Sequence, residues 1–223
     1  MAKKNYQKKI FILGCDSDLA NALIHEANHK NFKVLLHHRS TRMKQHHSNK
    51  YDYLYGDIRD KNFLERFQEF IEINKPDIYL NCIGSHSSEN FENISEELIR
   101  DAIEVNILYP TLLLKKIYSY FLKNQGGTII NISSIASSYD SQNESLYSMG
   151  KSAMHKLHRC LRLESYKKNI NIINILPGAF KSKMTKGRKN FDELPEPNEL
   201  ASLIYNFIQL ENFNVNELEI RRK

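Results

Sequence analysis

Residues 10–36, IFILGCDSDLANALIHEANHKNFKVLL, hold the strongest indication of the fold. They begin with an apolar run, residues 10–13, which ends at Gly14 and predicts a buried strand. Residues 18–30 follow with apolar side chains at helical spacing, and residues 32–36 form a second apolar run. This order of strand, turn, helix and strand predicts a βαβ unit, whose two strands lie parallel.

The same alternation continues to the end of the chain. Further strands are predicted at residues 51–55, 77–82, 128–132, 170–176 and 215–220, and helices around residues 63–71, 94–122, 146–167 and 198–210. Pro110 lies inside the longest of these helices and is expected to kink or break it. The pattern predicts an α/β protein with a doubly wound, mostly parallel seven-stranded sheet and helices on both faces. Because such sheets bind ligands beyond the carboxyl ends of their strands, the residues after each strand are the candidate site.

Length and composition narrow the class of protein. A chain of 223 residues, 41% of them apolar, predicts one folded domain over residues 1–223 and excludes a disordered chain. No apolar run approaches the roughly 20 residues of a membrane helix, and the first residues lack a signal-peptide core. We therefore expect a cytoplasmic protein without a membrane partner. The charged segment 178–196 is expected to be a loop, and it is short for a substrate loop.

The net charge of +6 does not by itself indicate a nucleic-acid partner. Basic residues are mixed with acidic ones along the chain, and the denser runs lie at the two ends. We predict no nucleic-acid binding, and a modest attraction for an anionic small molecule such as a phosphorylated cofactor. His37, His38, His46 and His47 raise the question of a metal site. No Cys or carboxylate at ligand spacing completes one, so no metal is predicted.

The turn after the first strand contains Gly14, Ser17 and Asp18. A nucleotide-binding turn needs glycine for close approach to the diphosphate, with a helix N-terminus aimed at the phosphates. Only Gly14 is present from such a glycine-rich pattern. The alternative is an ordinary strand-to-helix turn in which Ser17 or Asp18 caps the helix.

Arg39 follows the second predicted strand, where an adenosine ribose would lie in a fold of this class. An acidic residue there favours a free 2′-hydroxyl group, whereas an arginine favours a 2′-phosphate. Arg39 with no acid at position 38 therefore points to a 2′-phosphate. The alternative is that Arg39 is an ordinary surface residue.

Tyr147 and Lys151 stand thirteen and seventeen residues after Ser134, which follows the fifth predicted strand. Positions i and i+4 share one face of a helix. The pKa of a free tyrosine, about 10, is too high for efficient proton transfer near neutrality, and a nearby ammonium group lowers it. The hydroxyl group of Ser134 could then hold the reacting oxygen of a substrate. Taken alone, this spacing is also compatible with an ordinary surface helix.

Five motifs in order resemble the short-chain dehydrogenase/reductase family: Asn81-Cys82-Ile83-Gly84, Val105-Asn106, Ile132-Ser133-Ser134, Tyr147-x-x-x-Lys151 and Pro177-Gly178. The resemblance extends from about Lys9 to Ile220 and implies a Rossmann-type fold. It implies a catalytic set of four residues, Asn106, Ser134, Tyr147 and Lys151. By that resemblance Tyr147 is the general acid/base and Ser134 polarises the substrate oxygen. Lys151 lowers the pKa of Tyr147 and binds the nicotinamide ribose, and Asn106 supports a water that relays protons to Lys151.

The resemblance also implies a nicotinamide cofactor. The expected contacts are Gly14, Ser17, Asp18, Leu19, Arg39, Asp57, Ile58, Asn81, Cys82, Ile83, Gly84, Tyr147, Lys151, Pro177, Gly178 and Ser182. We expect NADP, because of Arg39, with NAD as a possibility. The family pattern Thr-Gly-x-x-x-Gly-x-Gly reads Leu13, Gly14, Asp18 and Ala20 here. A carboxylate at position 18 is unfavourable near a diphosphate unless it turns away or caps the helix.

Two functions follow from these residues. The first is an NADP(H)-dependent oxidoreductase that interconverts a carbonyl and a secondary alcohol by hydride transfer, on a small-molecule substrate. The alternative is a catalytically weak or inactive binding or regulatory protein with a degenerate glycine turn. A nucleotide-sugar epimerase shares Tyr-x-x-x-Lys but needs a larger C-terminal substrate domain. The family often forms homodimers or homotetramers through the helices that carry Asn106 and Tyr147, so we expect an oligomer.

Overall fold

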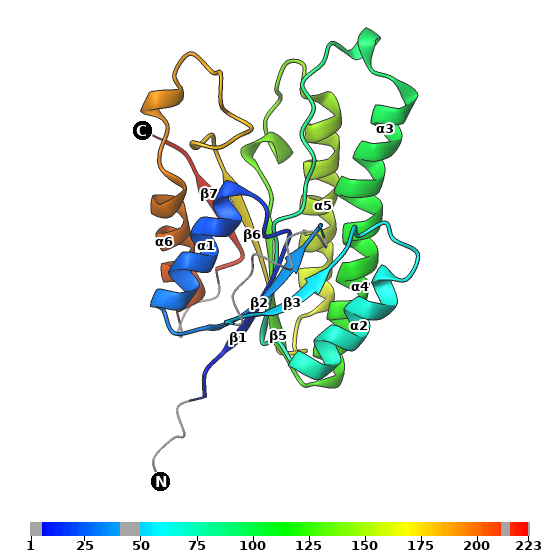
Figure 1. The fold of residues 1–223 in the computed structure, drawn as a ribbon, viewed down its shortest axis with the longest axis vertical. Coiled ribbons are helices and arrows are strands. Elements are labelled where there is room, and N and C mark those ends of the chain that lie inside the picture. Colours follow the sequence, from blue (N-terminus) through cyan, green and yellow to red (C-terminus); the bar gives the residue numbers. More distant parts are fainter. Residues whose placement is uncertain (1–5, 41–49, 211–214, 223) are drawn as a thin grey trace.

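The computed structural model describes residues 6–40, 50–210 and 215–222. Its centre is a seven-stranded sheet in the order β3-β2-β1-β4-β5-β6-β7, in which each neighbouring pair is parallel (Figure 1). The strands are β1 (Lys9–Leu13), β2 (Lys33–His38), β3 (Asp52–Tyr55), β4 (Ile78–Asn81), β5 (Gly127–Ile132), β6 (Ile170–Pro177) and β7 (Glu217–Ile220). The α/β, doubly wound, seven-stranded prediction is confirmed.

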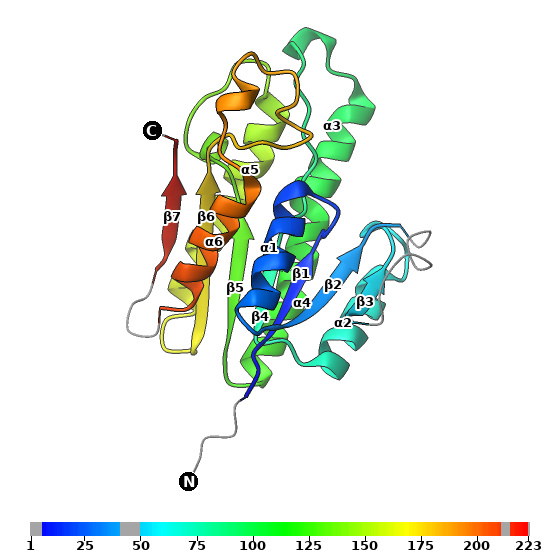
Figure 2. The ribbon, with the colours of Figure 1, turned by 60° about the vertical axis from the view of Figure 1, so that its left-hand side comes forward.

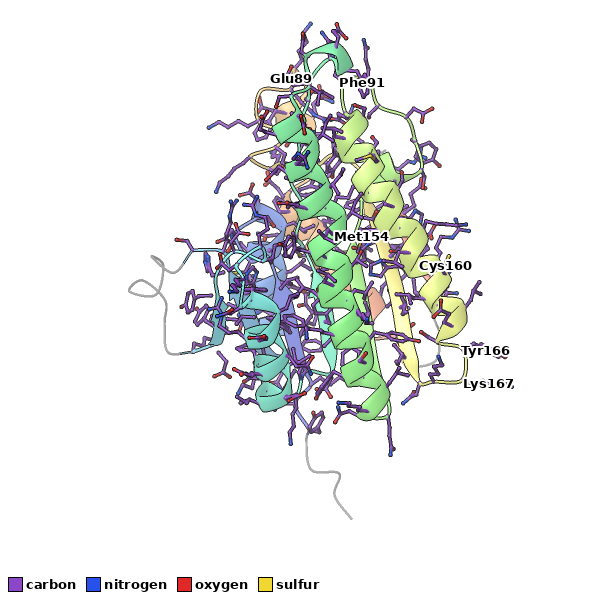
Figure 3. All side chains as sticks on the ribbon, turned by 90° about the vertical axis from the view of Figure 1, so that its right-hand side faces the viewer. Glu89, Phe91, Met154, Cys160, Tyr166 and Lys167 are labelled. Carbon is purple, nitrogen blue, oxygen red and sulfur yellow. The ribbon has the colours of Figure 1, made fainter. Side chains whose placement is uncertain are left out.

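Helices cover both faces of the sheet. They are α1 (Asp18–His29), α2 (Phe63–Asn74), α3 (Glu96–Ile103), α4 (Tyr109–Lys123), α5 (Ser145–Glu164) and α6 (Pro197–Ile208). Helices α1 and α6 lie on one face (Figure 2), and α2, α4 and α5 lie side by side on the other (Figure 3). Within the described residues, none of these helices has the length and apolar character that crossing a membrane requires.

The two-sided cover follows from the composition of the strands. In β1, Ile10 and Ile12 belong to the apolar core under α1 and α6, whereas Phe11 and Leu13 belong to the core under α2, α4 and α5. All four side chains are fully buried. A strand without a polar face must be covered on both sides, because each buried side chain of this size stabilises the fold by about 1.5–3 kcal/mol.

The helical stretch predicted at residues 94–122 is continuous and contains an irregular turn that matters for the site. Helix α3 passes into a π-helical turn, Glu104–Leu108, before α4 begins at Tyr109. Pro110 lies directly after this turn. The irregularity expected at Pro110 is therefore a π-helical turn and not a break, because the backbone stays helical through Ile103, Leu108 and Tyr109. Asn106 lies in the π-helical turn, a feature often found at functional sites.

Several predicted strand boundaries differ from the structure by one or two residues. The last strand, predicted at residues 215–220, is β7 at Glu217–Ile220. The segment 178–196, predicted to be a loop, contains no strand and no α-helix, and has a 3-10 turn at Phe191–Glu193. Thr185 anchors it, since this buried side chain donates a hydrogen bond from Oγ1 to the carbonyl of Phe180 at 2.7 Å.

Three asparagines form a row across the middle of the sheet. Asn81 on β4 lies in register with Asn131 on β5, which lies in register with Asn174 on β6. All three are buried, and Asn131 Nδ2 donates to Asn174 Oδ1 at 3.1 Å. Asn81 Nδ2 lies 3.5 Å from Asn131 Oδ1. The row places amide groups, which need hydrogen-bond partners, among strands that are otherwise apolar.

Candidate active site

Two adjoining cavities open at the carboxyl ends of the strands. The larger, about 340 Å³, is lined by Ser134, Tyr147 and Lys151, and the smaller, about 250 Å³, by Gly14 and Arg39. Ser17, Cys82 and Gly84 line both of them. Their position agrees with the rule for doubly wound sheets, and together they form a long site divided at the first turn.

Tyr147 and Lys151 lie one turn apart on α5 and face the larger cavity. Lys151 Nζ lies 5.7 Å from the centre of the Tyr147 ring and donates a hydrogen bond to the carbonyl of Ile132 at 3.0 Å. Ser134 caps a short 3-10 turn, Ile135–Ser137, where its Oγ accepts a hydrogen bond from the Ala136 amide at 3.1 Å. The three polar groups therefore line one cavity, as a site for proton transfer to a ligand oxygen requires.

Asn106 lies behind this group, not in the cavity wall. Its side chain is only 5% exposed, accepts a hydrogen bond from the Ser85 amide at 2.8 Å and donates to the Ser85 carbonyl at 3.1 Å. A Cβ atom on Gly150 would come within 2.6 Å of Asn106 Cβ, so this glycine lets α5 pack against the π-helical turn. The side chain of Asn106 thus ties that turn to the loop after β4. The water relay implied by the resemblance stays a prediction.

The first turn is supported by a buried histidine. Gly14 has a φ of 83°, and its amide donates to His37 Nδ1 at 3.2 Å. His37 Nε2 lies 2.8 Å from the carbonyl of Gly56, which assigns the ring proton to Nε2. Burial lowers the pKa of His37 to about 4, so the ring is neutral near pH 7. A Cβ atom on Gly14 would lie 2.9 Å from Ile83 Cγ1, so this position requires glycine.

Ser17 and Asp18 were both candidates for the N-cap of α1, and they make different contacts in the structure. Ser17 Oγ accepts a hydrogen bond from the Ala20 amide at 3.1 Å and caps α1. The carboxylate of Asp18 accepts a hydrogen bond from the backbone amide of Lys183 at 2.7 Å. Asp18 therefore turns toward the segment 178–196, and its charge is partly neutralised by that hydrogen bond.

The smaller cavity combines basic and acidic side chains. Arg39 Nε pairs with Asp57 Oδ2 at 3.0 Å, and the Arg39 side chain is 70% exposed. Arg59 also pairs with Asp57, at 2.9 Å, and its hydrogen bonds hold the pKa of Asp57 well below its usual range. The amide of Arg39 donates to Asp16 Oδ2 at 3.1 Å. Sequence reasoning missed Asp16, because this acid reaches the end of β2 from a different turn.

Three potential metal ligands lie close together at the ends of β1 and β2. Cys15, Asp16 and His38 each offer one ligand atom, and these atoms lie within 4.8 Å of one another. They come from the ends of two strands, so no fixed spacing along the chain indicates them. Burial raises the pKa of the Cys15 thiol to about 12, which keeps it protonated in the absence of a metal. His46 and His47 lie outside the described residues.

Most of the predicted site residues lie in the two cavities. The larger is lined by Ser17, Asp18, Leu19, Cys82, Gly84, Ser134, Tyr147, Lys151, Pro177, Gly178 and Ser182. The smaller is lined by Gly14, Ser17, Arg39, Asp57, Ile58, Cys82, Ile83 and Gly84. Asn81 and Asn106 are not among the described residues that line either cavity. Asn81 supports the loop after β4, because its Oδ1 accepts a hydrogen bond from the Ile83 amide at 3.1 Å.

Among the side chains in the wall of the larger cavity that sequence reasoning missed are His86, Glu144 and Arg188. His86 lies two residues after Gly84, and Glu144 lies one helical turn before Tyr147. The sequence could therefore have indicated His86 and Glu144 as site residues. It could not have indicated Arg188, because the segment that carries Arg188 has no motif of its own.

Comparison with known proteins finds a matching family and several relatives. The family model described as short chain dehydrogenase matches residues 8–193. An uncharacterized oxidoreductase of Staphylococcus haemolyticus is 32% identical over 150 residues, which cover 65% of this chain and 64% of that protein. The first relatives are thus matched over less than two thirds of their length. An uncharacterized oxidoreductase of Staphylococcus aureus is 25% identical over 96% of both chains.

Solved structures share the fold over almost the whole chain. A structure of ElxO with NADP bound has a TM-score of 0.81 and 21% identity, covering 96% of this chain and 98% of its own. A 3-ketoacyl-(acyl-carrier-protein) reductase from Brucella melitensis, complexed with NADH, has a TM-score of 0.82 and 18% identity, covering 96% of both chains. At these identities the likeness is one of fold.

Proposed function

The chain belongs to the short-chain dehydrogenases, a family of NAD(P)-dependent oxidoreductases, and we propose that it interconverts a carbonyl and a secondary alcohol on a small molecule. The observation that carries this proposal is the cavity in which Ser134, Tyr147 and Lys151 meet. A nicotinamide cofactor suits the adjoining cavities. Gly14 lies where a Cβ atom would collide with the next loop, and the capped N-terminus of α1 points at their junction.

The chain's own residues would handle the proton and the orientation of the substrate. Tyr147 would donate a proton to the carbonyl oxygen, or take it from the alcohol, and Ser134 would hold that oxygen by a hydrogen bond. The Lys151 ammonium group, 5.7 Å from the centre of the Tyr147 ring, would bind the nicotinamide ribose. The bound cofactor supplies the hydride.

A screen of carbonyl compounds with NADPH, followed by absorbance, tests the proposal. The Tyr147→Phe variant serves as the blank, because it removes the proton donor and keeps the ring. We expect turnover by the parent protein and none by the variant, with cofactor binding unchanged in a fluorescence titration. Activity retained in the Tyr147→Phe variant would remove Tyr147 from the acid/base position.

We favour NADP over NAD. The exposed guanidinium group of Arg39 in the smaller cavity supports this choice, since an arginine accommodates a 2′-phosphate. The Asp16 carboxylate on the same cavity opposes it, because it would repel a phosphate and could accept a ribose hydroxyl group. Relatives of the same fold bind either nucleotide.

The second candidate is a binding or regulatory protein without turnover. Asp18 favours it, because this carboxylate replaces a glycine of the family pattern at the turn where the diphosphate would lie. Absence of binding of either dinucleotide at millimolar concentration would select this alternative.

We further propose a homodimer or homotetramer and a single domain over residues 1–223, and the cytoplasmic location stays a prediction. An interface is supported by large apolar side chains that are at least 40% exposed on or beside the helices that carry Asn106 and Tyr147, namely Ile103, Leu108 and Met149. Light scattering after gel filtration should give the mass of two or four chains. A Met149→Lys variant should give a smaller species.

A further inference from the structure

The cavity beside Tyr147 is bounded by three ionisable side chains from separate segments. His86 follows β4, Glu144 precedes α5, and Arg188 lies between β6 and α6. Glu144 Oε1 lies 3.1 Å from His86 Nε2 and 3.4 Å from Arg188 Nη2. The His86 ring meets the Tyr147 ring edge to face, with centroids 4.9 Å apart. The charged wall is therefore next to the proposed proton donor.

Arg188 has the capacity to bind a further acceptor. Its side chain is 47% exposed, whereas that of Glu144 is 14% exposed. The ion pair between them is long, and a guanidinium group carries five N–H donors in a planar fork. Such a fork binds a carboxylate through two parallel hydrogen bonds. Arg188 is thus placed to hold an acidic group of a ligand at the mouth of the cavity.

The charges of the wall favour an anionic ligand. Of the described residues that line this cavity, Lys151, Lys183 and Arg188 carry positive charge, and Asp18 and Glu144 carry negative charge. Asp18 already accepts the Lys183 amide, and Glu144 is held by His86. A carboxylate would enter a wall with an excess of positive charge, which favours its ionised form.

The geometry also limits the length of the ligand. Short contacts join Arg188 to Tyr147: Arg188 Nη2 lies 3.4 Å from Glu144 Oε1, which lies 3.1 Å from His86 Nε2, and the His86 ring packs 4.9 Å from the Tyr147 ring. A ligand that binds Arg188 through a carboxylate and reaches Tyr147 with an oxygen must therefore be short. Ile135, Phe180 and Met184 supply apolar wall for the carbon chain.

We propose that the substrate is a short oxo acid or hydroxy acid whose carboxylate is bound by Arg188. This inference rests on the proposed function. In the reducing direction, hydride passes from NADPH to the carbonyl carbon and a proton passes from Tyr147 to the oxygen. The products are the hydroxy acid and NADP⁺, and solvent returns the proton to Tyr147.

Matched pairs of compounds test the proposal. Pyruvate, acetoacetate and levulinate place the ketone two, three and four carbons into the chain, and their methyl esters remove the charge. We expect at least one acid to be reduced at least 10-fold more efficiently, in kcat/KM, than its ester. The Arg188→Gln variant should raise the KM for that acid at least 10-fold, change kcat less than threefold and leave the ester unaffected. Lys189→Gln is the control, because it removes one charge from the neighbouring exposed position.

A binding measurement separates this inference from the proposed function. Titration calorimetry with each acid and ester is run on the protein alone and on the protein with NADP⁺. If no compound turns over but an acid binds and Arg188→Gln weakens that binding at least 10-fold, Arg188 is the carboxylate site and the proposed reaction is wrong. Esters that bind or react as well as their acids, an Arg188→Gln variant that behaves like Lys189→Gln, or binding of no acid would each overturn the inference.

Discussion

The two ends of the site are built in different ways. At the end proposed for catalysis, named the catalytic end below, Tyr147 and Lys151 come from one helix, and their separation is fixed by a single helical turn. At the turn after β1, the Ser17 cap is local, but Gly14 and Asp18 are held by distant segments. Gly14 depends on His37, and Asp18 depends on Lys183, 165 residues further along the chain. The catalytic end therefore keeps its geometry locally, whereas the turn depends on the assembled fold.

The difference bears on the glycine pattern of the turn after β1. Positions 18 and 20, which are glycines in the family pattern, are Asp18 and Ala20 here. Side chains at positions 17 and 18 form a helix cap and a link to the outer segment. At the other end, all four positions of the family's catalytic set keep the family's residues, Asn106, Ser134, Tyr147 and Lys151.

The largest expected effect comes from the catalytic end. Lys151→Met keeps the length of the side chain but removes the ammonium group beside Tyr147. We expect kcat/KM to fall about 1,000-fold, which corresponds to about 4 kcal/mol. Lys156→Met, at an exposed position of the same helix, is the control and should keep full activity. A Lys151→Met variant with more than a tenth of the parent activity would contradict the local arrangement described above.

Two buried histidines set the expected stability at acidic pH: His37 beside the turn after β1, and His158 on α5, outside both cavities. Burial lowers the pKa of both His37 and His158 to about 4, from 6.5 in the unfolded chain. The unfolded state therefore binds more protons between pH 6.5 and 4, and stability falls as the pH falls through that window. Each histidine should lower the free energy of unfolding by about 3 kcal/mol across it. Protonation of paired carboxylates such as Asp57 reduces stability only at lower pH, because the pKa of Asp57 in the unfolded chain is 3.8.

Urea denaturation at pH 7, 5.5 and 4 measures this effect. His37→Gln and His158→Gln should each flatten the pH dependence by about half of the histidine contribution. A variant whose pH dependence equals that of the parent protein would show that the replaced histidine does not destabilise the fold as the pH falls.

The next largest effect is expected on the preference for NADPH over NADH. The parent protein should bind NADPH at least about 10-fold tighter than NADH, a difference of about 1.4 kcal/mol. Arg39→Gln should remove this preference by weakening NADPH alone, and Asp16→Asn should increase it. Arg100→Gln, an exposed arginine on α3, is the control. Equal affinities of the parent protein in a fluorescence titration would show that Arg39 does not meet a 2′-phosphate.

The smallest effect is expected at Asp18. Asp18→Ala removes the acceptor of the Lys183 amide, at a cost of about 1 kcal/mol, because the hydrogen bond is exposed. Hydrogen exchange of the residue 183 amide should become faster in the variant, while residues of α5 keep their protection. Asp140→Ala, an exposed acid, is the matched control. Unchanged exchange at residue 183 would mean that Asp18 does not hold the outer segment.

The features that the sequence predicted correctly are those that repeat or lie close together. The apolar strands, the helix between the first two of them and the pair Tyr147 and Lys151 needed only local spacing. The π-helical turn at Asn106 was visible only through Pro110, since a proline marks an irregularity without stating its form.

The rest required distances in space. Nothing near Gly14 in the sequence indicates that His37 holds its amide, and nothing near Asp18 indicates Lys183. Arg188 belongs to a segment with no periodicity, which is placed by a buried Thr185 and not by a helix or strand. Such contacts join residues whose order along the chain carries no information about their pairing.

The asparagine row has a consequence for how the strands find their alignment. Strands β5 and β6 are rich in isoleucine and covered on both sides, so sliding one residue past its partner would exchange one apolar side chain for another. A sheet of this kind has little inside-to-outside contrast to oppose such a slip. Asn81, Asn131 and Asn174 supply this contrast, because a shifted strand would bury an amide against isoleucine. The three asparagines therefore favour the observed register of the central strands over a register shifted by one residue.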